Sequence, residues 1–136
     1  LVGVTAQQQK RLPEGVEGIQ RTDSVEELAE LYSRAAVFVN PTYIDNFPTT
    51  NLEALACGTP VVTYDTGGSP ESVSEEVGAV VPQGDIAALA EAVQTWGAAS
   101  HNADTAALCR TRAERFYDAE ERFRDHVDAY EALMNG

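Results

Sequence analysis

Short apolar runs alternate with helical patterns along this chain, and that alternation constrains its fold more than any other feature. Five runs predict strands: 1–5, 16–20, 36–40, 60–64 and 77–81. The third run, Ala36-Val37-Phe38-Val39-Asn40, is almost uniformly apolar, as expected for a strand that is covered on both faces. Strands that alternate with helices are typical of a mostly parallel sheet. The sequence therefore predicts an α/β fold with a parallel sheet flanked by helices.

Three longer segments carry helical patterns. Residues 24–34 predict a helix that Ser24 and Glu27 begin as a capping box. Its buried stripe would consist of Val25, Leu28, Leu31 and Tyr32. A second helix follows Gly84-Asp85, with Ile86, Leu89, Ala90 and Val93 on one face. The C-terminal segment, from about 104 to 134, is also helical, with these apolar anchors: Phe116, Tyr117, Phe123, Val127, Tyr130 and Leu133.

The length of the chain, 136 residues, predicts one domain that spans 1–136. The sequence has no initiator Met, and its first residues, Leu1-Val2-Gly3-Val4, already have the pattern of a buried strand. We therefore expect the chain to be a fragment of a longer protein.

The charge of the chain narrows the classes of partner. Nine basic and 22 acidic residues give a formal net charge of −13, which repels nucleic acid and anionic lipid at long range. No apolar run approaches the roughly 20 residues that span a bilayer, and no signal-peptide pattern is present. We expect a cytoplasmic protein without a transmembrane segment or a nucleic-acid partner. An anionic nucleotide would bind only where the site provides a local positive field.

The cysteines and histidines show no metal-site pattern. Cys57 and Cys109 have neither metal-ligand nor redox spacing, so we expect both thiols to be reduced. His101 lies in a polar linker and His126 in an acidic helix, and neither has a partner at ligand spacing. The sequence therefore predicts no metal site and no histidine that acts as a general base.

The segment Asp45-Asn46-Phe47-Pro48-Thr49-Thr50-Asn51-Leu52-Glu53 has the composition of a binding loop. Asp45 lies in the loop after a predicted strand, and Glu53 lies eight positions later, inside a short helix. Three side chains are candidate caps for this helix: Thr49, Thr50 and Asn51. A helix start carries free N–H groups and partial positive charge that favour phosphate, while flanking carboxylates accept hydrogen bonds from hydroxyls. The alternative is a capped helix with two solvated acids.

Glycines mark the next two turns. Gly58 would end the short helix, and Pro60 would prevent its continuation. Gly67-Gly68 follows the predicted strand 60–64, and Ser69-Pro70 would then begin another helix, with Ser69 as its cap. Without a Cβ, backbone at the two glycines can approach a sugar or a phosphate. Ligands of open α/β sheets collect at the carboxyl ends of the strands, where both loops lie. The alternative is a tight turn and a helix cap.

The residues from Val37 to Gly68 resemble the nucleotide-sugar-binding half of family 4 glycosyltransferases of GT-B architecture. Their signature is an acid, Gly-Phe-Gly-like residues and then Leu-Glu-Ala-hydrophobic-Ala-small-Gly-x-Pro-Val-Val. It stands here as Asp45-Asn46-Phe47 and Leu52 to Val62. The string from Asn46 to Glu53 is especially similar to enzymes that make bacterial surface polysaccharides. The resemblance covers essentially the whole chain and implies a single Rossmann-like nucleotide-sugar-binding domain.

The resemblance also implies roles for individual residues. Glu53 would accept hydrogen bonds from ribose hydroxyls, and Asp45 would meet a hydroxyl of the transferred sugar; these are the expected catalytic residues. The expected substrate-binding residues are Asn46, Phe47, Pro48, Thr49, Thr50, Asn51, Gly67 and Gly68. Family members retain anomeric configuration and need no metal or other cofactor, only a nucleotide-diphosphate sugar as donor substrate. Positioned dipoles would stabilise the departing nucleoside diphosphate and an oxocarbenium-like sugar.

Two parts of the family's fold are expected to lie outside this chain. One is a strand, a loop and a helix whose Arg and Lys grip the diphosphate, because residues 1–5 match the family's second strand. The missing first strand would lie in the middle of a sheet of order 3-2-1-4-5-6. We therefore expect the sheet either to lose continuity at that position or to fill the gap with another strand, from this chain or from another chain. The other is the N-terminal domain that binds the acceptor. We therefore expect the chain alone to be inactive.

The function that the resemblance implies is that of a donor-binding domain in a retaining glycosyltransferase. The intact enzyme would move a hexose from a UDP- or GDP-sugar to a glycan or lipid-linked acceptor, in surface polysaccharide synthesis. It would be cytoplasmic, either free or bound peripherally at the inner face of the membrane. The alternative from another class is a non-catalytic module that binds a nucleotide sugar or a protein. A nucleotide-sugar epimerase is disfavoured because that class uses other catalytic acids and a different glycine pattern.

Overall fold

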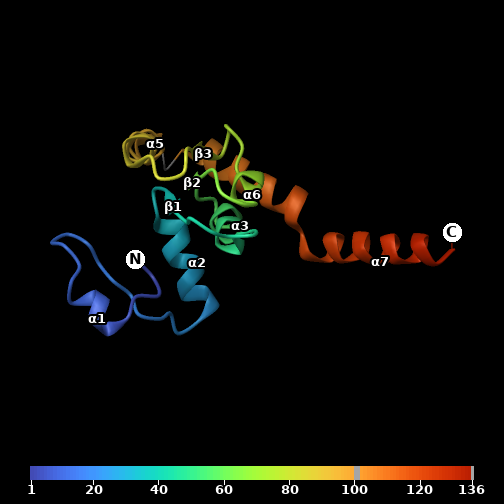
Figure 1. Cartoon of the computed structure of the whole chain (residues 1–136), viewed down its shortest axis with the longest axis horizontal. Helices are drawn as coiled ribbons and strands as arrows, with labels where there is room; N and C mark the ends of the chain where they lie inside the picture. The colour runs from blue at the N-terminus through green and yellow to red at the C-terminus, as the bar shows by residue number, and fades with distance from the viewer. Residues whose placement is uncertain (100–101, 136) are drawn as a thin grey trace. The chain divides into compact units, whose positions relative to one another are not determined.

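The structure is a computed structural model that describes residues 1–99 and 102–135. Its contacts divide the chain into two compact units, Leu1–Leu31 and Tyr32–Gly136. The helices and strands carry the labels of Figure 1. The assignment of one domain to residues 1–136 stays a prediction.

The first unit contains little regular structure. Its short helix α1 (Ala6–Gln9) begins at a capping box in which Thr5 and Gln8 exchange side-chain and backbone hydrogen bonds. The runs 1–5 and 16–20, predicted as strands, form only one isolated parallel bridge, between Val2 and Ile19. The prediction of strands at 1–5 and 16–20 is therefore wrong, because each run contributes only one residue to a bridge and neither forms a strand.

Helix α2 (Val25–Arg34) contributes residues to both units and confirms the predicted helix. Ser24 Oγ accepts a hydrogen bond from the Glu27 N–H, as in a capping box, but the Glu27 carboxylate accepts from the Asp23 N–H rather than from Ser24. The predicted buried stripe is only partly correct. Val25 is 78% exposed, whereas Leu28, Leu31 and Tyr32 are half-buried.

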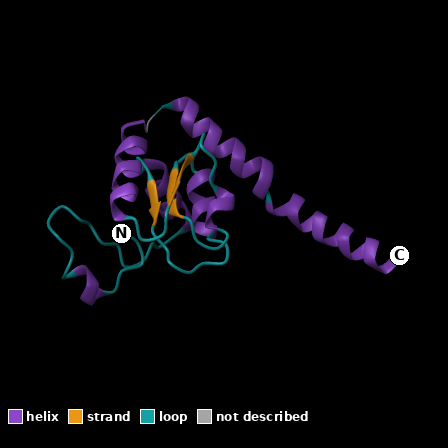
Figure 2. Cartoon of the chain, turned by 45° about the horizontal axis from the view of Figure 1, so that its top comes forward, coloured by secondary structure: helices purple, strands orange, loops and turns teal. Residues whose placement is uncertain are grey.

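The second unit holds a parallel sheet of order β1-β2-β3, built from Phe38–Asn40, Val61–Tyr64 and Gly78–Val81. Val39 pairs with Val62, and Val62 in turn pairs with Ala79. Every residue of β2 is buried, and Figure 2 shows helices on both sides of the strands. The predicted α/β fold is confirmed. Among the described residues, the sheet contains three of the five predicted strands, and β1 is one of its two edge strands.

Five helices follow β1 in the part of the chain that the structure describes: α3 (Thr49–Ala56), α4 (Ser69–Ser72), α5 (Ile86–Ala99), α6 (Ala103–Tyr117) and α7 (Ala119–Asn135). Helix α3 packs against α6, and α5 packs against β2 and β3. The core of this unit consists of Ala54, Leu55, Val61, Val73, Val77, Cys109 and Ala113. Because α3 contacts both the sheet and α6, the end of the loop that leads into α3 is held in a fixed position.

The helical C-terminus is confirmed, but its predicted apolar anchors are mostly wrong. Phe123 is 70% exposed and Leu133 81% exposed, and Phe116, Val127 and Tyr130 are also exposed. Only Tyr117 is half-buried. In α5, Asp85 caps the helix through the Ala88 N–H, but Ile86 is exposed. Ala90 is exposed as well, whereas Leu89 and Val93 are half-buried as predicted.

Candidate functional site

Two loops meet at the carboxyl ends of β1 and β2. We call residues 41–48 the acid loop and residues 65–68 the glycine turn. The Gly68 N–H donates to the Asn46 carbonyl at 2.9 Å, which joins the two loops. Within the acid loop, Asp45 Oδ1 accepts from the Phe47 N–H at 3.1 Å, so one carboxylate oxygen is used to shape the loop.

The glycines of the turn are required by this meeting of the loops. A Cβ on Gly67 would lie 1.8 Å from the Asp45 carbonyl oxygen, and a Cβ on Gly68 would lie 2.3 Å from that of Asn46. Gly67 also has a φ of +52°, which glycine adopts without strain. In the structure, the backbone that lies against these two glycines is that of the acid loop. The predicted approach of a sugar or a phosphate to Gly67 and Gly68 stays a prediction.

Helix α3 begins beside this junction. Pro48 is its N-cap residue, and no side chain caps the helix. The prediction that Thr49, Thr50 or Asn51 caps α3 is therefore wrong, because the helix begins one residue earlier. Thr49 and Thr50 are exposed in the first turn, where backbone N–H groups have no intrahelical acceptor. The helix start thus presents N–H donors next to the acid loop.

Asn51 lies in the interior instead of facing outward. Its side chain is fully buried, accepts a hydrogen bond from the Asn40 amide at 2.9 Å, and donates to Ser69 Oγ and Ser72 Oγ, each at 3.0 Å. Thr63 Oγ1 lies 2.6 Å from Ser69 Oγ. We call these five residues the buried polar network. It fixes the start of α3 to β1, β2 and α4.

The buried polar network corrects one prediction and adds residues that sequence reasoning missed. Ser69 is not the cap of α4: Gly68 is its N-cap residue, and the Ser69 side chain turns inward to Thr63 and Asn51. The signal in the sequence is the presence of Asn40 and Thr63 inside otherwise apolar strands. Buried polar side chains need partners, which such residues can supply to one another.

Glu53, the second predicted acid, lies exposed on α3. Its Oε2 accepts a hydrogen bond from the Tyr32 hydroxyl at 3.1 Å. Burial, together with the negative charge of Glu53, raises the pKa of Tyr32 well above its usual range. Sequence reasoning assigned Tyr32 to a buried stripe and missed this contact.

Helix α6 supports the site from the other side. Arg112 donates to the carbonyls of Ser72 and Glu71, at 2.7 and 2.9 Å, and the Tyr117 hydroxyl also donates to the Glu71 carbonyl, at 2.8 Å. The ring of Tyr117 lies 5.9 Å from that of Phe47, centroid to centroid. The guanidinium of Arg112 is thus used to hold the end of α4. Sequence reasoning did not anticipate this role.

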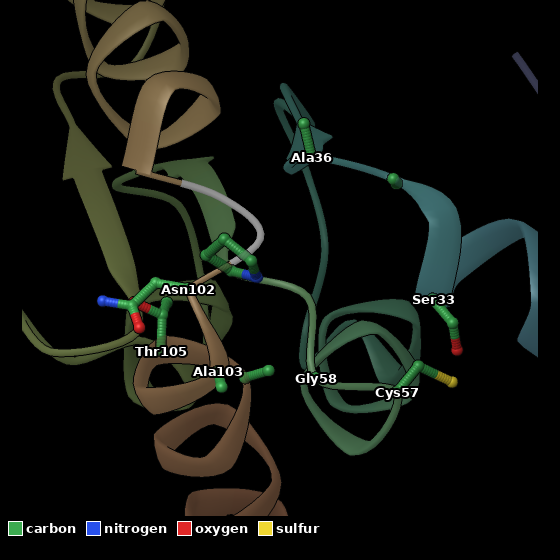
Figure 3. Close-up of a pocket in the computed structure, with 10 residues that line it drawn as sticks. Ser33, Ala36, Cys57, Gly58, Asn102, Ala103 and Thr105 are labelled. Carbon is green, nitrogen blue, oxygen red and sulfur yellow. The ribbon is translucent and has the colours of Figure 1, made fainter.

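A cavity of about 310 Å³ lies away from the acid loop, at the amino ends of β1 and β2 (Figure 3). Ala35 and Ala36 line it next to β1, Gly58 and Pro60 line it next to β2, and the start of α6 completes it. It contains none of the predicted site residues. Since ligands of parallel sheets bind at the carboxyl ends of the strands, we place the candidate site at the acid loop rather than in this cavity.

The described part of the chain contains potential metal ligands, long helices and two thiols. Within residues 1–99 and 102–135, no group of three or more His, Cys, Asp or Glu side chains could hold a metal ion, and His101 lies outside them. No helix in the described part of the chain is long and apolar enough to cross a membrane. Cys57 and Cys109 are free thiols, and burial raises the pKa of Cys109 to about 11.

Comparisons with known proteins agree with the motif. Residues 1–97 match the family described as "Glycosyl transferases group 1". The chain is 43% identical over 63 residues to alpha-maltose-1-phosphate synthase of Mycobacterium tuberculosis, which is 46% of this chain and 16% of that protein. It is 32% identical over 129 residues to an exopolysaccharide phosphotransferase of Streptomyces coelicolor, 88% of this chain and 13% of that protein.

A solved structure shows the same fold. Sucrose-phosphate synthase from Thermosynechococcus elongatus superposes with a TM-score of 0.79 at 32% sequence identity, over 94% of this chain and 32% of that one. The chain therefore spans under a third of each protein that we compare with it. The family match covers more than half of the chain, and the fold and the motif at Asp45 to Val62 agree with it. The chain belongs to the glycosyl transferases group 1 family, the family 4 glycosyltransferases of GT-B architecture.

Proposed function

We propose that this chain is the donor-binding domain of a retaining glycosyltransferase. The intact protein would move a hexose from a UDP- or GDP-sugar to an acceptor. The observation that carries the proposal is the junction at the carboxyl ends of β1 and β2. There the acid loop is hydrogen-bonded to the glycine turn directly before the exposed start of α3. One side of the sheet thus presents a carboxylate beside free N–H donors.

The chemistry of this junction suits the parts of a nucleotide sugar. The free N–H groups of Thr49 and Thr50, with the positive end of α3, would face the diphosphate. Asp45 has one carboxylate oxygen left after its bond to the Phe47 N–H, and that oxygen would accept from a hydroxyl of the sugar. Glu53 would accept from the ribose.

The remaining proposed contacts complete the site. Asn46, Phe47 and Pro48 would form its wall, with Gly67 and Gly68 holding that wall in place. Asn51 would act through its side-chain bonds, since its own N–H already donates to the Pro48 carbonyl. Leaving-group departure would be favoured by dipoles that are fixed before the reaction. We propose no metal and no cofactor besides the donor.

The acceptor is proposed from the relatives. The match over 88% of the chain to a protein named for exopolysaccharide supports a glycan or lipid-linked acceptor in surface polysaccharide synthesis. A phosphorylated sugar is the second candidate, because alpha-maltose-1-phosphate synthase and sucrose-phosphate synthase are both named for sugar phosphates. The proposed location is the cytoplasm, at or near the inner face of the membrane.

Isothermal titration of UDP, GDP and their glucose and mannose conjugates tests the donor site. We expect one base to bind, and Glu53→Ala to weaken that binding at least tenfold. Glu131→Ala, an exposed acid on α7, is the matched control for the loss of one charge and should bind as the wild type does. Binding that is equal in all three proteins would refute the proposal. Donor binding without sugar transfer by the intact protein would favour the non-catalytic module.

A further inference from the structure

Both the backbone and the ring of Tyr32 are fixed within the second unit. Its carbonyl accepts a hydrogen bond from Thr59 Oγ1 at 2.6 Å, and Thr59 is only 2% exposed. Its ring packs edge-on against Phe38 of β1, with ring centroids 5.4 Å apart and an interplanar angle of 76°. Backbone and ring are therefore both anchored to the sheet side of the unit, and the position of the hydroxyl follows from them.

The hydroxyl of Tyr32 reaches a side chain that has little other support. Glu53 lies exposed on α3, and a glutamate in that setting samples many rotamers. The 3.1 Å hydrogen bond from Tyr32 to Oε2 favours the rotamers that keep the carboxylate beside the phenol. Among the described residues, Oε1 has no hydrogen-bond partner. One carboxylate oxygen is thus held by the protein, and the other remains open to a ligand.

The phenol of Tyr32 has a proton to donate at neutral pH, as an ordinary tyrosine does. Burial, together with the charge of Glu53, raises its pKa further. The ring of Phe38, against which Tyr32 packs, offers no acceptor, and the Tyr32 hydroxyl donates to Glu53. A phenylalanine would fill the same space without that donor.

We propose that Tyr32 is a positioning residue for Glu53, and that it thereby sets the preference of the site for a ribonucleotide over one that lacks the ribose hydroxyls. This inference rests on the proposed function, in which Glu53 accepts from the ribose. It adds a residue from α2 that the sequence motif does not contain. Tyr32 itself would touch no substrate.

Tyr32→Phe removes only the hydroxyl and is the direct test. Isothermal titration would compare UDP and GDP with their 2′,3′-dideoxy counterparts in the wild type, in Tyr32→Phe and in Tyr130→Phe. Tyr130 is exposed on α7, so its variant controls for the loss of a phenol hydroxyl. We expect Tyr32→Phe to weaken ribonucleotide binding about 3- to 10-fold, the order of one ordinary hydrogen bond, because the lost bond orders Glu53 rather than the ligand itself. Dideoxynucleotide binding should stay unchanged.

The outcomes separate the two proposals. If the wild type prefers the ribonucleotide and Tyr32→Phe prefers it equally, or if that variant weakens both ligands alike, the positioning role of Tyr32 is refuted while the donor site stands. If the wild type binds both ligands equally or neither, the proposed role of Glu53 fails, and the inference falls with it. A double variant with Glu53→Ala should lose no more affinity than Glu53→Ala alone. Circular dichroism and a urea midpoint verify that each variant is folded.

Discussion

Gly67→Ala should damage the junction between the acid loop and the glycine turn more than any other alanine substitution of a glycine in the second unit. The new Cβ would lie 1.8 Å from the Asp45 carbonyl oxygen, where real Cβ contacts stay above 3.0 Å. Backbone on both sides of this contact belongs to the two loops, so neither can give way by turning a side chain. The loops must separate, and the Gly68 hydrogen bond to Asn46 would be lengthened or lost.

The expected cost has two parts. A φ of +52° costs an alanine about 1–2 kcal/mol. Forcing an atom into filled space adds about 1–3 kcal/mol. The free energy of unfolding should therefore fall by about 2–5 kcal/mol. Gly58→Ala is the matched control, because Gly58 also has a positive φ, +82°, but its Cβ would meet Ala106 Cβ at 3.2 Å, a contact that a small shift relieves.

Urea unfolding followed by circular dichroism measures both variants on the same scale. Gly58→Ala should lose about 1–2 kcal/mol, so the difference between the two variants reports the collision with the acid loop. Nucleotide affinity should fall in Gly67→Ala but stay near that of the wild type in Gly58→Ala, which lies at the other end of α3. If Gly67→Ala costs no more than Gly58→Ala and binds nucleotide normally, the loops do not meet as described.

Three further predictions concern the supports of the site. Asn51→Ala leaves the buried hydroxyls of Ser69 and Ser72 without their donor and should lower the free energy of unfolding by about 2–4 kcal/mol in urea, whereas Asn46→Ala, at an exposed position, should change it by under about 0.5 kcal/mol. Arg112→Lys cannot reach both carbonyls at the end of α4 and should speed amide exchange there, while Arg110→Lys, an exposed neighbour, should not. Burial raises the pKa of Cys109 from 9.0 to about 11, so above pH 9 the unfolded chain loses this proton first. The contribution of the Cys109 thiol to the free energy of unfolding should therefore decline between pH 9 and pH 11. The variant Cys109→Ala should not show this decline.

The fold class could be predicted from the sequence because it depends on local patterns. Apolar runs of strand length at 36–40, 60–64 and 77–81 each became a strand of the sheet. The helices at 24–34 and beyond 104 likewise follow from periodicity and capping signals. Runs 1–5 and 16–20 have the same local pattern, but a strand also needs a neighbour to pair with along its length, and the sequence pattern does not supply one.

The details of the site depend on contacts between distant positions, which local patterns do not contain. Thr49, Thr50 and Asn51 are all good capping residues, and Pro48 precedes them with a φ of −73° that suits a helix entry. Asn51 is drawn inward by Asn40 and by the two serines of α4, 18 and 21 positions away in the chain.

The apolar pattern of α7 has a similar limit. It shows that one face of a helix is apolar, yet Phe123 and Leu133 are exposed in the structure. The family motif predicts Asp45 and Glu53 as site acids from sequence spacing alone, and their roles stay predictions. The contact of Glu53 with Tyr32 joins positions 21 residues apart and became visible only in the structure.

The most direct test of the donor site is an amide chemical-shift map of the chain, recorded during titration with the nucleoside diphosphate that binds. We expect the largest shifts at Asn46, Phe47, Thr49 and Thr50 and at Gly67 and Gly68, where the helix start meets the two loops. Shifts concentrated at Ala36, Cys57 and Thr105 would instead place the nucleotide in the cavity at the amino ends of β1 and β2, and would refute a donor site at the acid loop.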